Sequence, residues 1–142
     1  MRSDAELPRP AISVILATYH PRLDLLHWTL EALKRQTINR AEFEVVIVDN
    51  GSNPPLEAAA FWCDGSPALR MIREARSGLV HARIAGAAEA RAAVMVFVDD
   101  DNALDADYLA QALRIAAEEP SIGCFGGIAR PVFEGRQPAP WK

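Results

Sequence analysis

The sequence has few cysteines and no long apolar run, which argues against a zinc-binding, a disulfide-rich secreted or a membrane-spanning protein. Cys63 and Cys124, the two cysteines, show neither the paired spacing of a zinc site nor the density of a secreted disulfide scaffold. No stretch approaches the roughly 20 apolar residues of a membrane-spanning helix, and residues 1–10 lack the apolar core of a signal peptide. We expect a cytoplasmic protein, with attachment to the inner face of a membrane only through missing parts or partners.

An excess of positive charge is also absent. The chain carries 15 Lys and Arg against 19 Asp and Glu, a formal net charge of -4 at pH 7, and its basic residues are scattered. We therefore expect no nucleic-acid partner. The 142 residues, 50% hydrophobic and 24% charged, predict one compact domain. We assign residues 1–10 to a flexible leader, 11–134 to the domain, and 135–142 to a tail or truncation point.

Three motifs that cradle phosphates or present a nucleophile are missing. The first apolar run ends in Thr18-Tyr19-His20-Pro21, not in the G-x-G-x-x-G turn of dinucleotide-binding folds. The chain also has no G-x-x-x-x-G-K-[ST] loop and no G-x-S-x-G elbow. Without a glycine-rich cradle, a metal ion is the natural counter-charge for a diphosphate.

What the chain does contain is an apolar run that leads directly into three carboxylates. Residues 94–98 are typical of a buried strand, and Asp99, Asp100 and Asp101 follow at once. Adjacent carboxylates repel one another and resist burial, so they need a cation or many donors. Strand alternation places Asp99 and Asp101 on one face and Asp100 on the other. We interpret the run as a divalent metal site for a phosphate-bearing ligand; the alternative is an acidic turn that caps a helix near Asp105.

The other patterns alternate between strands and helices. Apolar runs predict strands over 11–17, 43–48, 69–72 and 94–98, with two more over 122–125 and 128–133. Helical spacing predicts helices over 21–36, 78–90 and 105–119, the last capped by Asp105, and a short one over 54–62. This order predicts a Rossmann-like α/β fold, a mainly parallel sheet with helices on both faces.

Polar residues follow three of the predicted strands, at the carboxyl edge where such sheets bind ligands. Asp49 is placed to accept a hydrogen bond from a base or ribose, or merely to form a turn. Arg83 is placed to reach a diphosphate, or is a solvated arginine. Tyr19 is placed to stack on a base or to fill the rim of a cleft. The converging groups are Thr18 and Tyr19, Asp49 and Ser52, and Asp99 to Asp101.

Four segments in order resemble the nucleotide-sugar glycosyltransferases of family 2, which have the GT-A fold. Residues 12–19 (ISVILATY) resemble the opening strand and turn of the family, and residues 45–52 (VVIVDNGS) its second strand. Residues 78–86 (GLVHARIAG) resemble its G-x-x-x-A-R-N-x-G helix, with Ile84 in place of Asn. Residues 97–101 (FVDDD) resemble its D-x-D metal motif.

The resemblance implies a role for each matching residue. Tyr19 and Asp49 would hold the nucleoside, Arg83 would lie near the nucleotide, and Asp101 would bind the Mg²⁺ or Mn²⁺ that bridges the diphosphate. His20 stands where the family commonly has Asn. The whole nucleotide-binding set that we expect is Thr18, Tyr19, Asp49, Ser52, Arg83, Asp99 and Asp100, the last two as candidates for ribose.

Members of this family continue well beyond the length of this chain, into an acceptor-binding half that supplies the base. The resemblance thus implies the donor half of an inverting, metal-dependent glycosyltransferase, whose donor is a nucleoside-diphosphate sugar and whose acceptor is a saccharide or lipid-linked hydroxyl. The alternative is a noncatalytic nucleotide-binding or interaction module. A sugar-phosphate nucleotidyltransferase is disfavoured because its glycine-rich loop is absent. Apolar surface left without a second half would favour a homo-oligomer.

Overall fold

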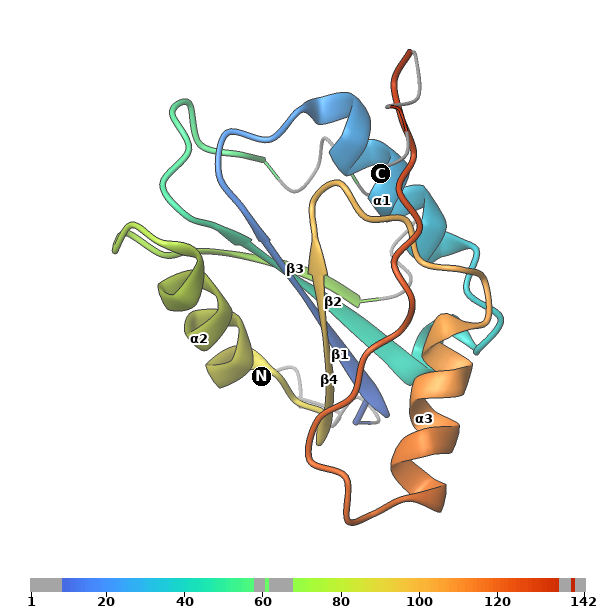
Figure 1. The fold of residues 1–142 in the computed structure, drawn as a ribbon. Helices are drawn as coiled ribbons and strands as arrows, with labels where there is room; N and C mark the ends of the chain where they lie inside the picture. Colours follow the sequence, from blue (N-terminus) through green and yellow to red (C-terminus); the bar gives the residue numbers. More distant parts are fainter. Residues whose placement is uncertain (1–8, 58–60, 62–67, 136–138, 140–142) are drawn as a thin grey trace, which may run out of the picture.

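The protein forms one four-stranded parallel sheet, as seen in a computed structural model that describes residues 9–57, 61, 68–135 and 139 (Figure 1). Its spatial order is β3-β2-β1-β4. β1 and β2 are buried along their whole length, which accounts for their continuous apolar sequences. The strands are β1 (Ile12–Thr18), β2 (Phe43–Asp49), β3 (Ala68–Arg73) and β4 (Val94–Asp99).

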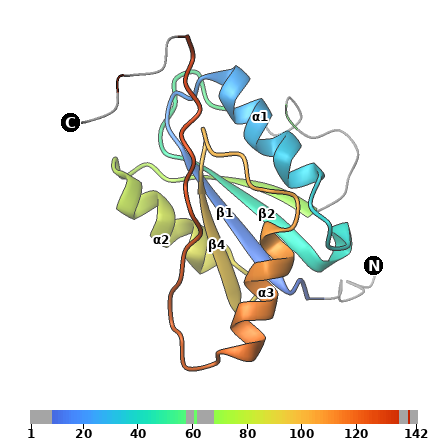
Figure 2. The same cartoon turned by 45° about the vertical axis from the view of Figure 1, so that its right-hand side comes forward.

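Helices cover both faces of this sheet, as expected for parallel strands joined by crossovers. Figure 2 shows α1 and α3 on one face and α2 on the other. A short 3₁₀ turn, η1 (Arg40–Glu42), leads into β2. The predicted Rossmann-like α/β fold is therefore confirmed. The helices are α1 (Leu23–Lys34), α2 (Leu79–Glu89) and α3 (Tyr108–Glu118).

The core consists of two layers, one on each face of the sheet. Alternate residues of β1 point to opposite layers: Val14 and Leu16 pack toward α1 and α3, and Ile15 and Ala17 pack toward α2. Gly86 allows α2 to approach closely, because a Cβ built there would lie 2.3 Å from Cγ2 of Ile15. This approach determines where the rest of α2 lies over the sheet.

A buried carboxylate joins three segments at the amino end of the sheet. Glu44, whose side chain is 1% exposed, accepts hydrogen bonds from Ser13 Oγ at 2.7 Å, and from the backbone N–H and Nε of Arg91, both at 2.8 Å. Burial raises the pKa of Glu44, but these hydrogen bonds and the charge of Arg70 outweigh it, so the pKa lies below its usual value. The ionised carboxylate thus stabilises the edge opposite to the predicted site.

Gln36, in the loop just after α1, positions the start of α3. Its Oε1 accepts from the backbone N–H of Leu109 at 3.0 Å, and its Nε2 donates to the carbonyls of Asp105 at 2.8 Å and Ala32 at 3.3 Å. The prediction that Asp105 caps this helix is wrong: Asp107 is the N-cap residue, and it makes no side-chain capping bond. The side-chain amide of Gln36, distant in the sequence, supplies the acceptor instead.

The two strands predicted over 122–125 and 128–133 are absent from the structure. This segment is irregular and exposed, with Ile128 91% accessible, and it runs past β4 toward the start of α1 in Figures 1 and 2. Glu134 ends it with an ion pair to Arg22 at 2.8 Å. Its apolar residues suit a pleated face, but no backbone ladder pairs them with a neighbour, so the strand prediction is wrong.

The short helix predicted over 54–62 is also not formed where the structure describes it. Residues 54–57 are irregular, and the backbone N–H of Leu56 donates to Asp49 Oδ2 at 3.3 Å instead of starting a helix. Residues 58–60 and 62, like most of the predicted leader and the end of the predicted tail, lie outside the described residues. Within the described ranges, no helix has the length and apolar character to cross a bilayer.

Candidate functional site

The parallel register aligns the polar strand ends along one edge of the sheet. Thr18 lies opposite Asp49 in the β1·β2 pair, Ala17 lies opposite Asp99 in the β1·β4 pair, and Asp49 lies opposite Arg73 in the β2·β3 pair. Residues from all four strands therefore meet at the carboxyl edge, where open parallel sheets bind their ligands.

A cavity of about 300 Å³ lies at the tips of β1 and β4, and we call it the acidic cavity. All three predicted aspartates line it, together with the loop after β1 and the first turn of α2. The Tyr19 side chain stands at its edge, 62% exposed, in an edge-on contact with the His20 ring at 4.5 Å. The lining residues are Ala17, Thr18, Tyr19, Asn50, Leu79, Ala82, Asp99, Asp100 and Asp101.

The three aspartates differ in their partners. Asp99 pairs with Arg83 of α2 at 2.9 Å, Asp100 accepts a hydrogen bond from Thr18 Oγ1, and Asp101 is exposed. The predicted alternation of faces is wrong because β4 ends at Asp99, where the backbone N–H of Asn102 bonds the Asp99 carbonyl at 3.2 Å. The chain turns there, so the three carboxylates line one cavity.

The acidic cavity offers a hard cation only oxygen ligands. Among the described residues, no three His, Cys, Asp or Glu side chains form a group that could hold a metal ion by themselves. Magnesium, however, is commonly held by one or two carboxylates together with substrate phosphates and water. Asp101 with Asp99 or Asp100 would provide that number, so the side chains fit Mg²⁺ or Mn²⁺ bound together with a diphosphate.

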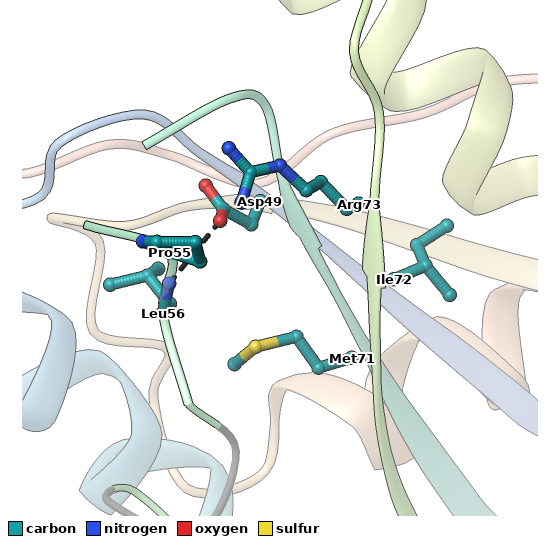
Figure 3. A pocket seen from close by; sticks show the side chains of 6 residues that line it. All are labelled: Asp49, Pro55, Leu56, Met71, Ile72 and Arg73. Carbon is teal, nitrogen blue, oxygen red and sulfur yellow. Dashed lines mark hydrogen bonds between the residues drawn. The ribbon is translucent and has the colours of Figure 1, made fainter. Parts of the chain in front are cut away.

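A second cavity of about 290 Å³ lies between the ends of β2 and β3, and we call it the Asp49 cavity. Figure 3 shows the Asp49 carboxylate and the Arg73 guanidinium close together at one end, with the Met71 side chain at the other. It thus combines a charged end with apolar walls, the common composition of a small-molecule site. Its lining residues are Asp49, Pro55, Leu56, Met71, Ile72 and Arg73.

Asp49 is held ionised by its surroundings. Burial raises the pKa of its carboxyl, but hydrogen bonds from Ser52 and Leu56 and the charge of Arg73 outweigh burial, so its pKa lies below the usual value. The backbone N–H of Ser52 donates to Asp49 Oδ1 at 2.8 Å. The carboxylate can still accept further hydrogen bonds, since each oxygen has two acceptor sites.

Hydrogen bonds join the loops around the two cavities. The buried Ser52 accepts from the backbone N–H of His20 at 2.9 Å through Oγ, and from Arg73 Nη2 at 3.1 Å through its carbonyl. Ser52 therefore connects the loop after β1 with the end of β3. Arg73 was not among the residues expected from the sequence. The sequence did contain one indication of its role: Arg73 directly follows the predicted strand over 69–72, and that strand is the next one along the chain after the strand that ends at Asp49.

The structure brings most of the predicted site residues together. Five of them line the acidic cavity, Asp49 lines the neighbouring cavity, and Ser52 links the loops between them. Arg83 reaches the acidic cavity through its pair with Asp99. Their roles toward a ligand stay predictions. The five in the acidic cavity are Thr18, Tyr19, Asp99, Asp100 and Asp101.

The parallel sheet with two cavities at its carboxyl edge defines the chain as a Rossmann-like α/β protein. Comparison with protein families makes this specific: residues 13–140 match the family described as "Glycosyl transferase family 2". The chain belongs to that family, as the resemblance of its four motifs predicted.

Individual relatives agree with this assignment. The putative glycosyltransferase EpsH of Bacillus subtilis (strain 168) is 29% identical over 114 residues, which cover 80% of this chain and 32% of EpsH. Residues 1–349 of S. aureus TarS superpose with a TM-score of 0.68 at 25% identity, covering 77% of this chain and 33% of that one. The same TarS fragment has also been solved with UDP-GlcNAc, at 24% identity to this chain.

A mannosyltransferase, PcManGT from Pyrobaculum calidifontis, superposes with a TM-score of 0.51 at 28% identity, over 66% of this chain and 28% of that one; its structure contains GDP-Man and Mn²⁺. This chain spans about a third of the length of EpsH and of the TarS fragment.

Proposed function

We propose that this chain is the donor-binding part of a metal-dependent glycosyltransferase and that it binds a nucleoside-diphosphate sugar. The observation that carries the proposal is the pair of neighbouring cavities, one of which has apolar walls and a charged end while the other is lined by carboxylates. Asp49 and Asn50, which are consecutive in the chain, line one cavity each. A nucleotide sugar likewise has a flat, partly apolar base next to a diphosphate.

The base lies in the Asp49 cavity in this proposal. The ionised Asp49 accepts a hydrogen bond from a ring N–H of the base, and the Arg73 guanidinium donates to a carbonyl oxygen beside it. Leu56 and Met71 provide apolar contact for the ring. The exposed Tyr19 ring is available to stack on the nucleoside.

The ribose and diphosphate lie in the acidic cavity. Asp99 or Asp100 accepts hydrogen bonds from ribose hydroxyls, and Arg83 neutralises part of the phosphate charge. Asp101, exposed and lining the same cavity, is the proposed ligand of Mg²⁺ or Mn²⁺. When bound, the ion stabilises the charge on the leaving nucleoside diphosphate. The Mn²⁺ in the mannosyltransferase neighbour supports this choice of ion.

Transfer to an acceptor hydroxyl, with inversion at the anomeric carbon, is the reaction that we propose for the whole enzyme. It needs a base near that hydroxyl, and we assign none of the described residues to this role. We also propose that the acceptor is a saccharide or lipid-linked hydroxyl and that the enzyme acts in the cytoplasm. The alternative is a noncatalytic nucleotide-binding or interaction module.

Calorimetric titration with UDP, GDP and dTDP, with and without Mn²⁺, tests the proposal. We expect at least one nucleotide to bind with Mn²⁺, and Asp101→Asn to weaken that binding about tenfold or more, since one charged ligand of the ion is lost. Asp105→Asn, an exposed acid in the same loop that lines neither cavity, is the matched control. Absence of binding by all three nucleotides, or unchanged binding by Asp101→Asn, would contradict the proposal.

A second assay separates the catalytic from the noncatalytic alternative. The purified chain is incubated with a UDP-sugar and Mn²⁺, and release of UDP is measured. The noncatalytic module predicts binding without release. Release of UDP that depends on Asp101 would refute the noncatalytic alternative.

A further inference from the structure

The Asn50 side chain has an unusually complete set of backbone partners. Its Nδ2 donates to the carbonyls of Glu74 at 3.0 Å and Arg76 at 2.7 Å, and its Oδ1 accepts from the backbone N–H of Gly78 at 2.9 Å. The residue is only 8% exposed. Both donors and the acceptor oxygen are therefore engaged within the protein, although Asn50 is among the residues that line the acidic cavity.

These three bonds hold the segment 74–78, which connects the two cavities. It begins directly after Arg73, which lines the Asp49 cavity, and it ends directly before α2. The first turn of α2 contributes Leu79 and Ala82 to the acidic cavity, and Arg83 follows. The β2·β3 pairing already fixes Arg73, whereas the position of the start of α2 depends on how this segment is held.

Asparagine suits this position better than aspartate, because the site needs two donors and one acceptor. A carboxylate of the same shape would keep the bond from Gly78 but would place an anionic oxygen against two carbonyl oxygens. The backbone at Gly78 has a φ of +124°, a conformation that side-chain-bearing residues rarely adopt but glycine tolerates, so the glycine allows the turn and the bond to Asn50 Oδ1 holds it. The backbone N–H of Glu74 adds a bond to the Asp49 carbonyl at 3.0 Å.

We propose that Asn50 is a positioning residue for nucleotide binding. It acts through the segment 74–78, which it holds so that the first turn of α2 faces the ligand beside Arg73, which the sheet fixes. This inference rests on the proposed function, because it assumes that a nucleotide occupies the two cavities. Preorganised loops raise affinity because the ligand does not have to order them on binding.

Gln36 provides a matched control for the test. It is also an amide that is 8% exposed, and it also donates to two carbonyls and accepts from one backbone N–H near the start of a helix. It lines neither cavity. Asn50→Asp and Gln36→Glu therefore make the same chemical change in two similar networks, only one of which lies at the site.

The experiment measures UDP affinity with Mn²⁺ at a temperature at which both variants are folded, together with the thermal midpoint of each. We expect both midpoints to fall. Asn50→Asp should raise Kd by about tenfold or more, whereas Gln36→Glu should leave Kd within about twofold, as expected for a distant site. Equal Kd values for Asn50→Asp and wild type would overturn the inference, as would a similar loss of affinity in Gln36→Glu.

Hydrogen exchange on the wild type tests the same contact without a variant. The Gly78 amide should exchange slowly in the folded chain without nucleotide, since Asn50 Oδ1 holds it. Exchange at the rate of an open loop would overturn the inference even if Asn50→Asp does not fold. A wild-type chain that protects Gly78 but binds no nucleotide would instead overturn the proposed function, which separates the two failures.

Discussion

Replacement of Gly86 by alanine gives the sharpest test of how α2 packs on the sheet. The helix propensity of alanine would by itself stabilise the chain by about 1 kcal/mol. The added Cβ, however, would lie 2.3 Å from Ile15 Cγ2 and 3.0 Å from Val48 Cγ2. Both neighbours are buried, β-branched side chains of the two central strands, so neither can rotate away without disturbing the core.

The two effects oppose each other, and the packing effect should be larger. Overpacking of a core costs about 1–3 kcal/mol, occasionally more, and a contact of 2.3 Å belongs at the upper end of that range. We therefore expect Gly86→Ala to lower the free energy of unfolding by about 2 kcal/mol after the gain in propensity. For a chain of this size the thermal midpoint should fall by about 4–8 °C.

Urea and thermal unfolding measure this difference. Ala88→Gly, at an exposed position of the same helix, calibrates the propensity effect alone and should cost about 1 kcal/mol. If Gly86→Ala were instead about 1 kcal/mol more stable than wild type, the close approach of α2 to β1 would be refuted. The position of Arg83 over the acidic cavity would then lose its structural basis.

Two further predictions concern opposite ends of the sheet. Because the pKa of Glu44 is lowered in the folded state, its stabilising effect is present above the unfolded pKa of about 4.3 and is lost as pH falls through the folded-state value. Glu44→Gln should therefore lower the free energy of unfolding by about 2–3 kcal/mol at pH 7. Urea unfolding at a series of pH values should show that the difference between the variant and wild type shrinks below about pH 4. A difference that stays constant with pH would contradict this prediction. Arg73→Ala should weaken the binding of UDP with Mn²⁺ about tenfold and leave the binding of pyrophosphate unchanged, as measured by calorimetry. Arg114→Ala, on the exposed face of α3, is the control variant. An equal loss of affinity for both ligands would show that Arg73 does not contact the base.

The strands were predictable wherever local sequence determines burial. β1 and β2 are enclosed on both faces, so each leaves an unbroken apolar run that ends at its polar tip. The convergence of Thr18, Asp49 and Asp99 followed from the rule that parallel strands end at the same edge. The family motifs added the order of these segments and a role for each.

The failures have a common physical cause, which is dependence on a distant partner. Whether residues 128–133 form a strand depends on a neighbouring backbone, and no local pattern provides one. The place of Arg73 opposite Asp49 depends on the register of two strands, and the cap of α3 depends on Gln36, just after α1. The alternation expected for Asp99 to Asp101 failed because the strand ended one residue into the acidic run.

The central place of β1 also determines the order in which the site can assemble. The hydrogen bond between Thr18 and Asp100 joins residues 82 positions apart, whereas the Ser13–Glu44 bond that links β1 to β2 spans 31. Closing the longer loop costs more chain entropy, so the β1–β2 pair is expected to form first during folding. On a ribosome, β4 also emerges last of the four strands. The acidic cavity is therefore a late product of folding, completed only after the Asp49 side of the sheet has formed.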